Sequence, residues 1–365
     1  MRPLTHFRGY GRRCVVVGVT ATLAAAVGAI GAVSASNAST LKTGAALSAL
    51  AIPPGCANAA CTVLYRPKPV KGSLHNATID FVSWSSTPFF DPMEAGVKAA
   101  AAALKDRGVT VRYVVAGPSL TLTYLVTAMQ DAVINGVTAM GADLLNGACP
   151  EIKAVVKAGV IVSGAVSQPA CAQAAGSLFY VAQNSVASGQ TAAHLLAKST
   201  NCKGPIGVID DPPANSSVGL RTVGFLGEIK KLCPGIKLLG PTINDDTAAS
   251  AYSITSGWIT GFPGLTGIYE SSAGDNGAAA AIKSAGKDGI VKFVGHDFVP
   301  ANVDLLNEGA VQDLIGQDPY GEGYNTIIDL FNYLVAHVVP KPYNQYTVSQ
   351  VMTTSNEKAI LATQG

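Results

Sequence analysis

From residue 76 onward, the apolar positions of the chain follow two alternating patterns. Short runs rich in Val and Ile, bounded by Gly, Pro or Asn, are typical of buried strands. Longer Ala-rich segments with polar residues every three or four positions are typical of amphipathic helices. The predicted strands cover residues 77–82, 109–115, 137–145, 160–164, 178–181, 206–209, 236–239, 265–269, 290–294, 311–315 and 345–352. The predicted helices cover residues 93–104, 122–133, 150–158, 186–198, 217–232, 247–260, 275–284, 301–308 and 320–338.

The strand–helix alternation runs through residues 76–198 and starts again at Pro205. Alternating strands and helices form parallel sheets with right-handed crossovers, so two runs predict two lobes. The expected fold class is α/β, with two similar Rossmann-like parallel-sheet lobes. Ligands of such sheets bind beyond the carboxyl ends of the strands. Residues that directly follow a strand are therefore the candidates for a binding site.

The first 35 residues have the pattern of a secretory signal peptide. Arg2, Arg8, Arg12 and Arg13 precede an uncharged apolar run from Cys14 to Val33, and small residues follow. This order of charged, apolar and cleavage regions predicts export to the cell envelope, periplasm or extracellular space. The alternative is a retained N-terminal membrane anchor, since the run approaches the length of a membrane span.

Residues 36–75, which are rich in Ser, Ala and Pro, are expected to form an N-terminal extension or tether. Without residues 1–35, the chain keeps 21 Lys and Arg against 23 Asp and Glu, because the predicted signal contains four arginines and no acids. A slightly acidic chain with only 13% charged residues does not attract nucleic acid. The composition therefore argues against a nucleic-acid partner.

The six cysteines that follow the predicted signal are expected to form disulfides, because an even number in an exported chain indicates pairing. Fifteen pairings are formally possible, and sequence order favours three local ones. These are Cys56–Cys61, Cys149–Cys171 and Cys202–Cys233. A zinc site is the rival interpretation, but the chain has no pair of CxxC motifs and no nearby histidine pair. We therefore expect no metal and no cofactor.

An aromatic turn follows the first predicted strand. Its sequence, Ser-Trp-Ser-Ser-Thr-Pro-Phe-Phe-Asp over residues 83–91, contains Trp84, Phe89 and Phe90. Aromatic faces stack against the C–H faces of sugar rings, so these residues are candidate ligand contacts. One of the two phenylalanines is expected to fill the core below instead.

The Pro-Phe-Phe turn and the Ala-rich helix after it resemble the opening of ribose/galactose-type periplasmic solute-binding proteins, the sugar-binding family of ABC transporters with the type I fold. The similarity continues through residues 76–352 in four further motifs. These are Asn184 in Val-Ala-Gln-Asn, Arg221 in Arg-Thr-Val-Gly-Phe, Asp297 in Val-Gly-His-Asp and Gln317 in Ile-Gly-Gln-Asp-Pro. The resemblance implies that these four residues bind ligand hydroxyls. Planar Arg donors, carboxylate acceptors and amides suit that role.

The resemblance also implies three hinge crossings, near residues 182–184, 317–319 and 343–346. The expected lobes are residues 76–182 plus 318–344 and residues 183–317 plus 345–365. Two family positions differ. Ala165-Val-Ser-Gln168 stands where sugar binders carry Asp-Arg, and Ser271 replaces an Asn. These changes favour a less hydroxylated or partly apolar ligand.

The expected function is that of a monomeric binding protein, which captures a sugar or sugar-like molecule for the membrane permease of an ABC importer. The alternative is a sensor that reports the ligand to a membrane receptor or kinase. No enzyme is expected, because the chain lacks the GxSxG, HExxH, Walker and GxGxxG motifs. His296 next to Asp297 has no nucleophile partner in the sequence, so it is weak support for catalysis.

Overall fold

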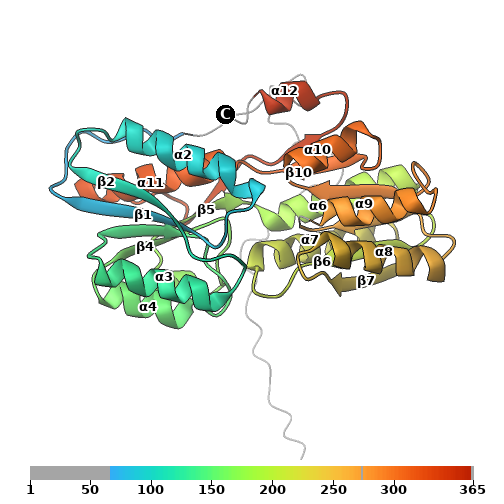
Figure 1. Ribbon diagram of the computed structural model, residues 1–365, viewed down its shortest axis with the longest axis horizontal. Coiled ribbons are helices and arrows are strands. Elements are labelled where there is room, and N and C mark those ends of the chain that lie inside the picture. Colours follow the sequence, from blue (N-terminus) through green and yellow to red (C-terminus); the bar gives the residue numbers. More distant parts are fainter. Residues whose placement is uncertain (1–65, 273, 363–365) are drawn as a thin grey trace, which may run out of the picture. The chain divides into compact units, whose positions relative to one another are not determined.

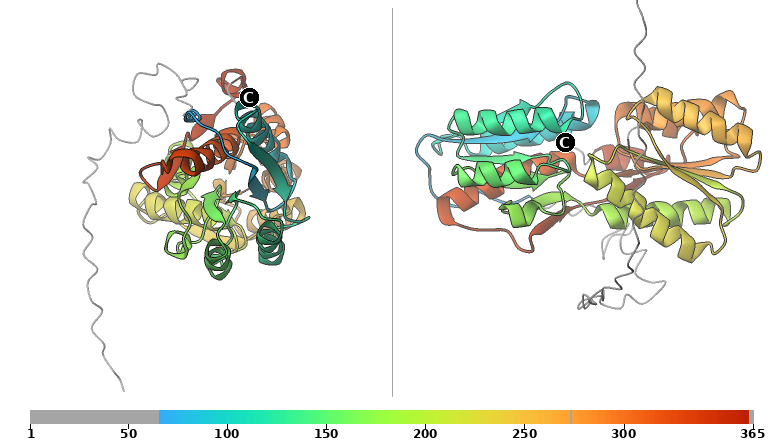
Figure 2. Two further views of the ribbon diagram at one scale, coloured as in Figure 1. Left: turned by 90° about the vertical axis from the view of Figure 1, so that its left-hand side faces the viewer. Right: turned by 90° about the horizontal axis from the view of Figure 1, so that it is seen from below.

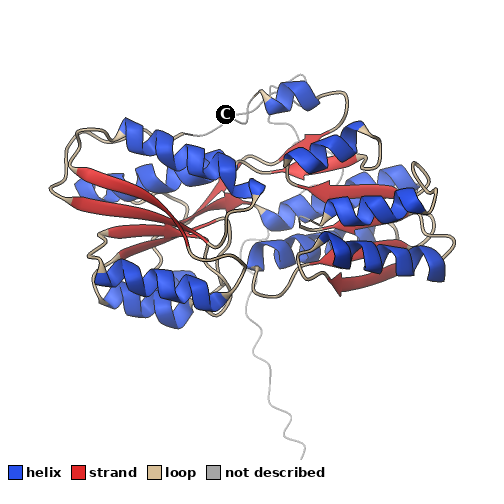
Figure 3. Cartoon of the chain, in the orientation of Figure 1, coloured by secondary structure: helices blue, strands red, loops and turns tan. Residues whose placement is uncertain are grey.

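The computed structural model describes residues 66–272 and 274–362 (Figure 1). These residues form two six-stranded sheets, each with helices on both faces, in agreement with the predicted α/β fold (Figure 3). The predicted signal peptide, residues 36–65 of the tether and the Cys56–Cys61 pair lie outside the described residues.

The first sheet has the strand order β11-β5-β4-β3-β1-β2, and all its strands are parallel. Its strands are β1 (Ala77–Ser83), β2 (Val109–Val115), β3 (Ala139–Ala142), β4 (Ile161–Ala165), β5 (Tyr180–Gln183) and β11 (Asn344–Thr347). Successive side chains of a strand point to opposite faces, so Phe81 and Val82 of β1 enter two different cores.

Two layers of helices bury the faces of this sheet (Figure 2). One layer contains α2 (Asp91–Ala103) and α11 (Pro319–Ala336), which share a core with Phe81. The other contains α3 (Leu122–Ile134), α4 (Cys149–Lys157) and the short α5 (Ala172–Ala175), whose core includes Val82. A 3-10 turn, η1 (Pro88–Phe90), leads into α2. Neither η1 nor α5 was predicted.

The second sheet has the order β12-β10-β9-β8-β6-β7 and is parallel except for β12, which runs antiparallel to β10. Its strands are β6 (Ile206–Asp210), β7 (Leu238–Ile243), β8 (Gly267–Glu270), β9 (Lys292–His296), β10 (Asp313–Gly316) and β12 (Gln350–Met352). One face is covered by α6 (Ser185–Thr200) and α7 (Ser216–Leu232). The other is covered by α8 (Ala248–Gly261), α9 (Asp275–Ser284) and α10 (Pro300–Asn307), and α12 (Glu357–Leu361) packs beside β12.

Three segments pass between the two sheets. The first follows β5 and the second follows β10, as predicted. The third prediction was wrong in position, because residues 345–352 form two strands rather than one. β11 pairs with β5 in the first sheet and β12 pairs with β10 in the second, so the chain crosses at Val348 and Ser349. Gln183 joins the crossings, since its Nε2 donates to the Gly316 carbonyl and to Ser349 Oγ, each at 3.0 Å.

Residues 66–75 pack on the first lobe, although the sequence predicted a tether up to residue 75. Asn332 on α11 accepts from the Val70 backbone N–H at 2.8 Å and donates to the Lys68 carbonyl at 3.1 Å. Arg66 donates to both carboxylate oxygens of Asp318, at 2.6 and 3.0 Å. These contacts hold the last ten residues of the predicted tether against the α11 helix.

Two of the predicted disulfides are present. Cys149–Cys171 ties α4 to the start of α5, with Cα atoms 6.1 Å apart. Cys202–Cys233 ties the ends of α6 and α7, with Cα atoms 5.2 Å apart. Both pairs are close in sequence, so local order was sufficient to predict them. No helix within residues 66–272 and 274–362 is long and apolar enough to cross a bilayer.

Candidate ligand-binding site

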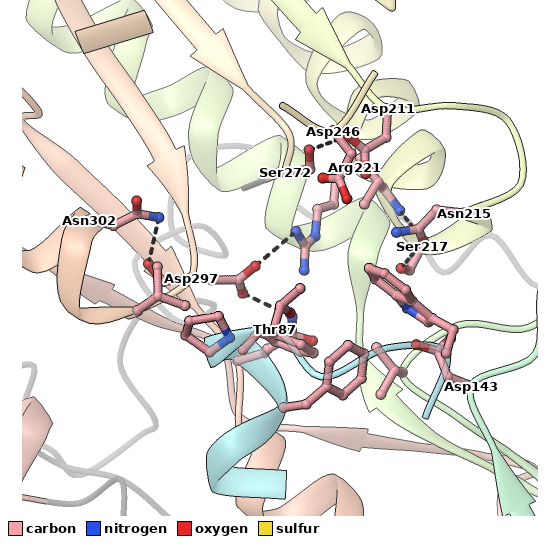
Figure 4. Close-up of a pocket in the computed structure, with 18 of the residues that line it drawn as sticks. Thr87, Asp143, Asp211, Asn215, Ser217, Arg221, Asp246, Ser272, Asp297 and Asn302 are labelled. Atoms are coloured by element: carbon pink, nitrogen blue, oxygen red, sulfur yellow. Dashed lines mark hydrogen bonds and ion pairs between the residues drawn. The ribbon is translucent and has the colours of Figure 1, made fainter. Parts of the chain in front are cut away.

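A cavity of about 310 Å³ lies at the carboxyl ends of the strands and is lined by both lobes (Figure 4). The first lobe contributes Trp84, Thr87, Pro88, Phe89, Phe90, Asp143 and Val166. The second lobe and the second crossing contribute Asp211, Asn215, Ser217, Val218, Arg221, Asp246, Ser272, Asn276, Asp297, Val299, Ala301, Asn302 and Gln317. Six of the eight predicted ligand residues therefore meet at one cavity.

Three aromatic rings form the wall contributed by the first lobe. Phe90 is only 2% exposed and packs into the core beneath, as expected for one of the two phenylalanines. Trp84 and Phe89 are half-buried, and each ring meets Phe90 edge to face, with centroid distances of 5.3 and 5.0 Å. Phe90 thus supports the two rings that are available to stack on a ligand.

Close packing of α6 on α7 fixes the position of Arg221. At Gly189 on α6, a Cβ would collide with the backbone carbonyl of Arg221, and at Gly224 on α7 it would collide with the backbone of Val186. Only glycine permits this approach of two helix backbones. The glycine of the Arg-x-x-Gly motif therefore has a packing role, and the arginine three residues earlier faces the cavity.

Arg221, Asp297 and Gln317 form one polar group in the cavity. Arg221 is 2% exposed, and its Nη1 donates to the Ser271 carbonyl at 2.9 Å and lies 3.8 Å from Asp297 Oδ2. Gln317 Nε2 donates to the other carboxylate oxygen, Oδ1, at 2.9 Å. Arg221 Nε is buried without a hydrogen-bond partner. An arginine with an unused donor beside a fixed carboxylate is suited to bind neighbouring hydroxyls.

The backbone at Asp297 is in the left-handed region, with a φ of 67°. This conformation is uncommon for residues other than glycine, although Asp tolerates it better than most. Asn302 stabilises the turn, because its Nδ2 donates to the His296 carbonyl at 2.8 Å. The turn directs the Asp297 carboxylate toward Arg221, as Figure 4 shows.

Two predicted ligand residues, Asn184 and Ser271, do not line the cavity. Asn184 Oδ1 accepts from the Ala187 backbone N–H at 3.1 Å, so the side chain caps α6. Ser271 is fully buried, and its Oγ donates to the Ile209 carbonyl at 3.1 Å. Its neighbour Ser272 reaches the cavity instead.

Three acidic residues of the cavity were not predicted. Asp143 follows β3, Asp211 follows β6, and Asp246 lies between β7 and α8. Burial raises the pKa of Asp143 well above its ordinary value. Burial, with a contribution from Asp246, raises the pKa of Asp211 to about 7, against hydrogen bonding from Ser272. The rule of polar residues directly after a strand would have found Asp211, whereas Asp143 lies inside the predicted strand 137–145.

His296 lies beneath the cavity and does not line it. Its Nε2 is 3.0 Å from the Tyr269 hydroxyl, and burial lowers the pKa of the imidazole well below its ordinary value. A fully buried, neutral imidazole behind Asp297 supports the wall of the cavity. Its position gives it no access to a ligand.

Comparison with known proteins agrees with this geometry. Residues 81–336 match the model of a periplasmic binding protein domain. Among solved structures, a carbohydrate transporter solute-binding protein from Agrobacterium radiobacter in complex with D-arabinose has a TM-score of 0.72 and 23% identity, over 80% of this chain and 100% of that one. A solute-binding protein from Bacillus halodurans with bound myo-inositol has a TM-score of 0.70 and 18% identity, over 80% and 99%. These likenesses show the fold.

A curated relative matches over a shorter region. The xylose/arabinose-binding protein XylF of Sulfolobus acidocaldarius is 22% identical over 186 residues, which is 49% of this chain and 45% of that protein. The chain thus spans less than half the length of this relative in the match.

Proposed function

The chain belongs to the periplasmic binding protein family, and we propose that it captures a sugar or sugar-like molecule in this cavity for the permease of an ABC importer. Its place of action is extracytoplasmic, as in the family. The observation that carries the proposal is the composition of the cavity. Aromatic rings from one lobe and polar side chains from the other line the same cavity, whose volume is about 310 Å³.

The two walls have complementary roles toward a sugar ring. Trp84 and Phe89 offer faces for the apolar C–H surface of the ring. Arg221, Asp297 and Gln317 offer donors and acceptors for its hydroxyls. A ligand without those hydroxyls leaves the buried groups unpaired, at a cost of about 1–3 kcal/mol for each group. The site therefore selects hydroxylated rings over apolar ones of similar size.

Capture follows from the division of the site between lobes. A ligand that contacts both lobes binds more tightly when they are close together, so it shifts the population toward the closed form. Hydrogen bonds between the lobes lie near the cavity, such as Asn146 Nδ2 to the Pro213 carbonyl at 2.7 Å and the 2.9 Å contact between the Ser167 and Ser216 hydroxyls. The closed surface then binds the permease. No covalent step is part of this mechanism.

The test is a thermal-shift screen of the purified protein against pentoses, hexoses and cyclic polyols, followed by calorimetry. A true ligand at about one hundred times its Kd adds about 2.7 kcal/mol to the free energy of unfolding. Arabinose, xylose and myo-inositol are included because relatives bind them. The panel also contains the amino derivatives of these sugars. Absence of a shift and of binding heat for every compound contradicts the proposal.

A further inference from the structure

The cavity has more acidic groups than a neutral sugar requires. Four carboxyl groups line it, from Asp143, Asp211, Asp246 and Asp297, and Arg221 is the one basic side chain among the described lining residues. Arg221 is paired with Asp297. The other three form no ion pair with any basic residue in the part of the chain that the structure describes. The cavity therefore has an excess of negative charge when its carboxyl groups are ionised.

Asp143 is the clearest case of a cavity carboxyl group without a hydrogen-bond partner in the protein. The residue is 1% exposed, and neither carboxyl oxygen makes a hydrogen bond of normal geometry within the protein. The indole of Trp84 and the backbone of Ser167 are near enough to offset part of the rise in its pKa caused by burial. A buried carboxyl without a full set of partners is costly for the folded protein. A ligand group that pairs with Asp143 would remove that cost.

Asp211 and Asp246 form a second acidic group on the wall of the other lobe. Figure 4 shows both near Ser272, on the side of Arg221 that faces away from Asp297. Ser272 donates its hydroxyl to Asp211 Oδ1. Titratable groups surround Asp211 on several elements, namely Asp210 on β6, Glu270 on β8, Asp246 after β7 and Arg221 on α7. Those that interact with Asp143 are Tyr113 on β2 and Tyr180 on β5.

Resting on the proposed function, we infer that the ligand is an amine-bearing sugar or polyol, whose protonated amine binds to one of the two acidic groups of the cavity, either Asp143 on the wall of the first lobe or Asp211 with Asp246 on the wall of the second. The group Arg221, Asp297 and Gln317 binds its hydroxyls. Neutral hydroxyls alone do not require the three acids, because Asn215, Ser217, Ser272, Asn276 and Asn302 already line the same cavity.

The surroundings favour an ammonium group over a metal ion as the cation. Within the described residues, no group of three or more acids, histidines or cysteines has an arrangement that could hold a metal. Trp84 also lines the cavity, and an indole face attracts an organic cation. An alkylammonium combines that contact with hydrogen bonds to separate carboxylates, whereas a metal ion needs several oxygens converging on one point.

The inference predicts release of protons on binding. An ammonium pairs with ionised carboxylates, and burial holds the pKa of Asp211 at about 7 in the free protein. An amine bound at Asp211 therefore displaces a proton from its carboxyl group, and the affinity for an amine that stays protonated rises as the pH increases through that value. A neutral sugar bound by Arg221, Asp297 and Gln317 has no such requirement.

The experiment compares amine and hydroxyl forms of the same skeleton by calorimetry. The pairs are D-glucosamine with D-glucose, D-galactosamine with D-galactose, and D-glucamine with D-glucitol. At about pH 7, we expect at least one amine form to bind about tenfold or more tightly than its parent. Repeating the titration in buffers of different ionisation enthalpy measures the protons released.

Isosteric variants locate the effect. Of Asp143→Asn and Asp211→Asn, the variant that removes the acid holding the amine is expected to reduce the ratio between the amine and parent affinities about tenfold. Asp329→Asn is the matched control, because Asp329 is a buried acid on α11 that does not line the cavity. Neutral sugars that bind as well as, or better than, every amine form overturn this inference and leave the proposed function intact. Failure of both forms, and of the wider sugar panel, overturns the two together.

Discussion

Replacing Arg221 with methionine separates the binding role of this residue from its structural role. Methionine keeps much of the length and apolar volume of the arginine stem but removes all of its donors. Arg221 Nη1 is occupied by the Ser271 carbonyl, whereas Nε is buried without a protein partner. The guanidinium has five N–H donors, and its contacts with Ser271 and Asp297 use Nη1 alone, so donors are left for the ligand. A hydrogen bond to a charged group contributes about 1.5–3 kcal/mol, which corresponds to about a 10- to 150-fold change in Kd.

The assay is calorimetry with the ligand identified by the screen, together with urea denaturation of the unliganded protein. Arg221→Met is expected to weaken binding by that factor and to lower the free energy of unfolding by about 1–3 kcal/mol, because the Ser271 carbonyl and Asp297 lose a buried partner. An affinity within about threefold of the natural protein would refute the assignment of Arg221 to the site.

Arg112→Met provides the matched control for this experiment. Arg112 on β2 donates to both carboxylate oxygens of the buried Asp80, each at 2.7 Å, and lies outside the cavity. Its loss is expected to reduce stability without a change in affinity. Equal loss of affinity in both variants would mean that the effect of Arg221→Met comes from general destabilisation.

Two further predictions concern the aromatic wall and the response to pH. Phe89→Ala is expected to weaken ligand binding by about tenfold with little loss of stability, whereas Phe90→Ala is expected to cost about 3–5 kcal/mol of stability. Calorimetry measures the affinity and urea denaturation measures the stability. The reverse pattern would contradict the assignment of Phe89 to the ligand and of Phe90 to the core. Burial raises the pKa of Asp329 to about 7, so the folded protein holds this proton more tightly than the unfolded chain and its stability falls as the pH rises from about 4 to 7. Asp329→Asn should flatten that part of a stability–pH curve, and an unchanged slope would count against the assignment.

The fold could be predicted from the sequence because the pattern of each element is locally consistent. Ala-rich segments such as residues 93–104 favour helix over most of their length, and β-branched runs such as residues 109–115 favour strand. Residues 345–352 were predicted as one strand because both halves have the composition of a strand. Their division depends on pairing with β5 and β10, which are distant in sequence.

The site was only partly predictable for a related reason. A residue after a strand is near the cavity, but the direction of its side chain depends on the backbone of the turn. Ser271 and Ser272 have the same side chain and adjacent positions, and only Ser272 lines the cavity. Asn184 has a suitable ligand side chain, but the backbone N–H of Ala187 uses it. The residue type alone does not show whether a polar side chain bonds the nearby backbone or a ligand.

The course of the chain between the sheets also affects how the protein is made. Because α11 and β11 come from residues 319–347, the first sheet and one of its helix layers are completed only after all of the second lobe except β12 and α12 has been synthesised. Residues 77–183 therefore emerge from the ribosome before α11, the helix that covers β1, β3, β4 and β5, has been synthesised. Contacts over such sequence distances form late, so this half cannot reach its native core during translation. This lobe therefore keeps apolar surface exposed until residues 319–347 have been made.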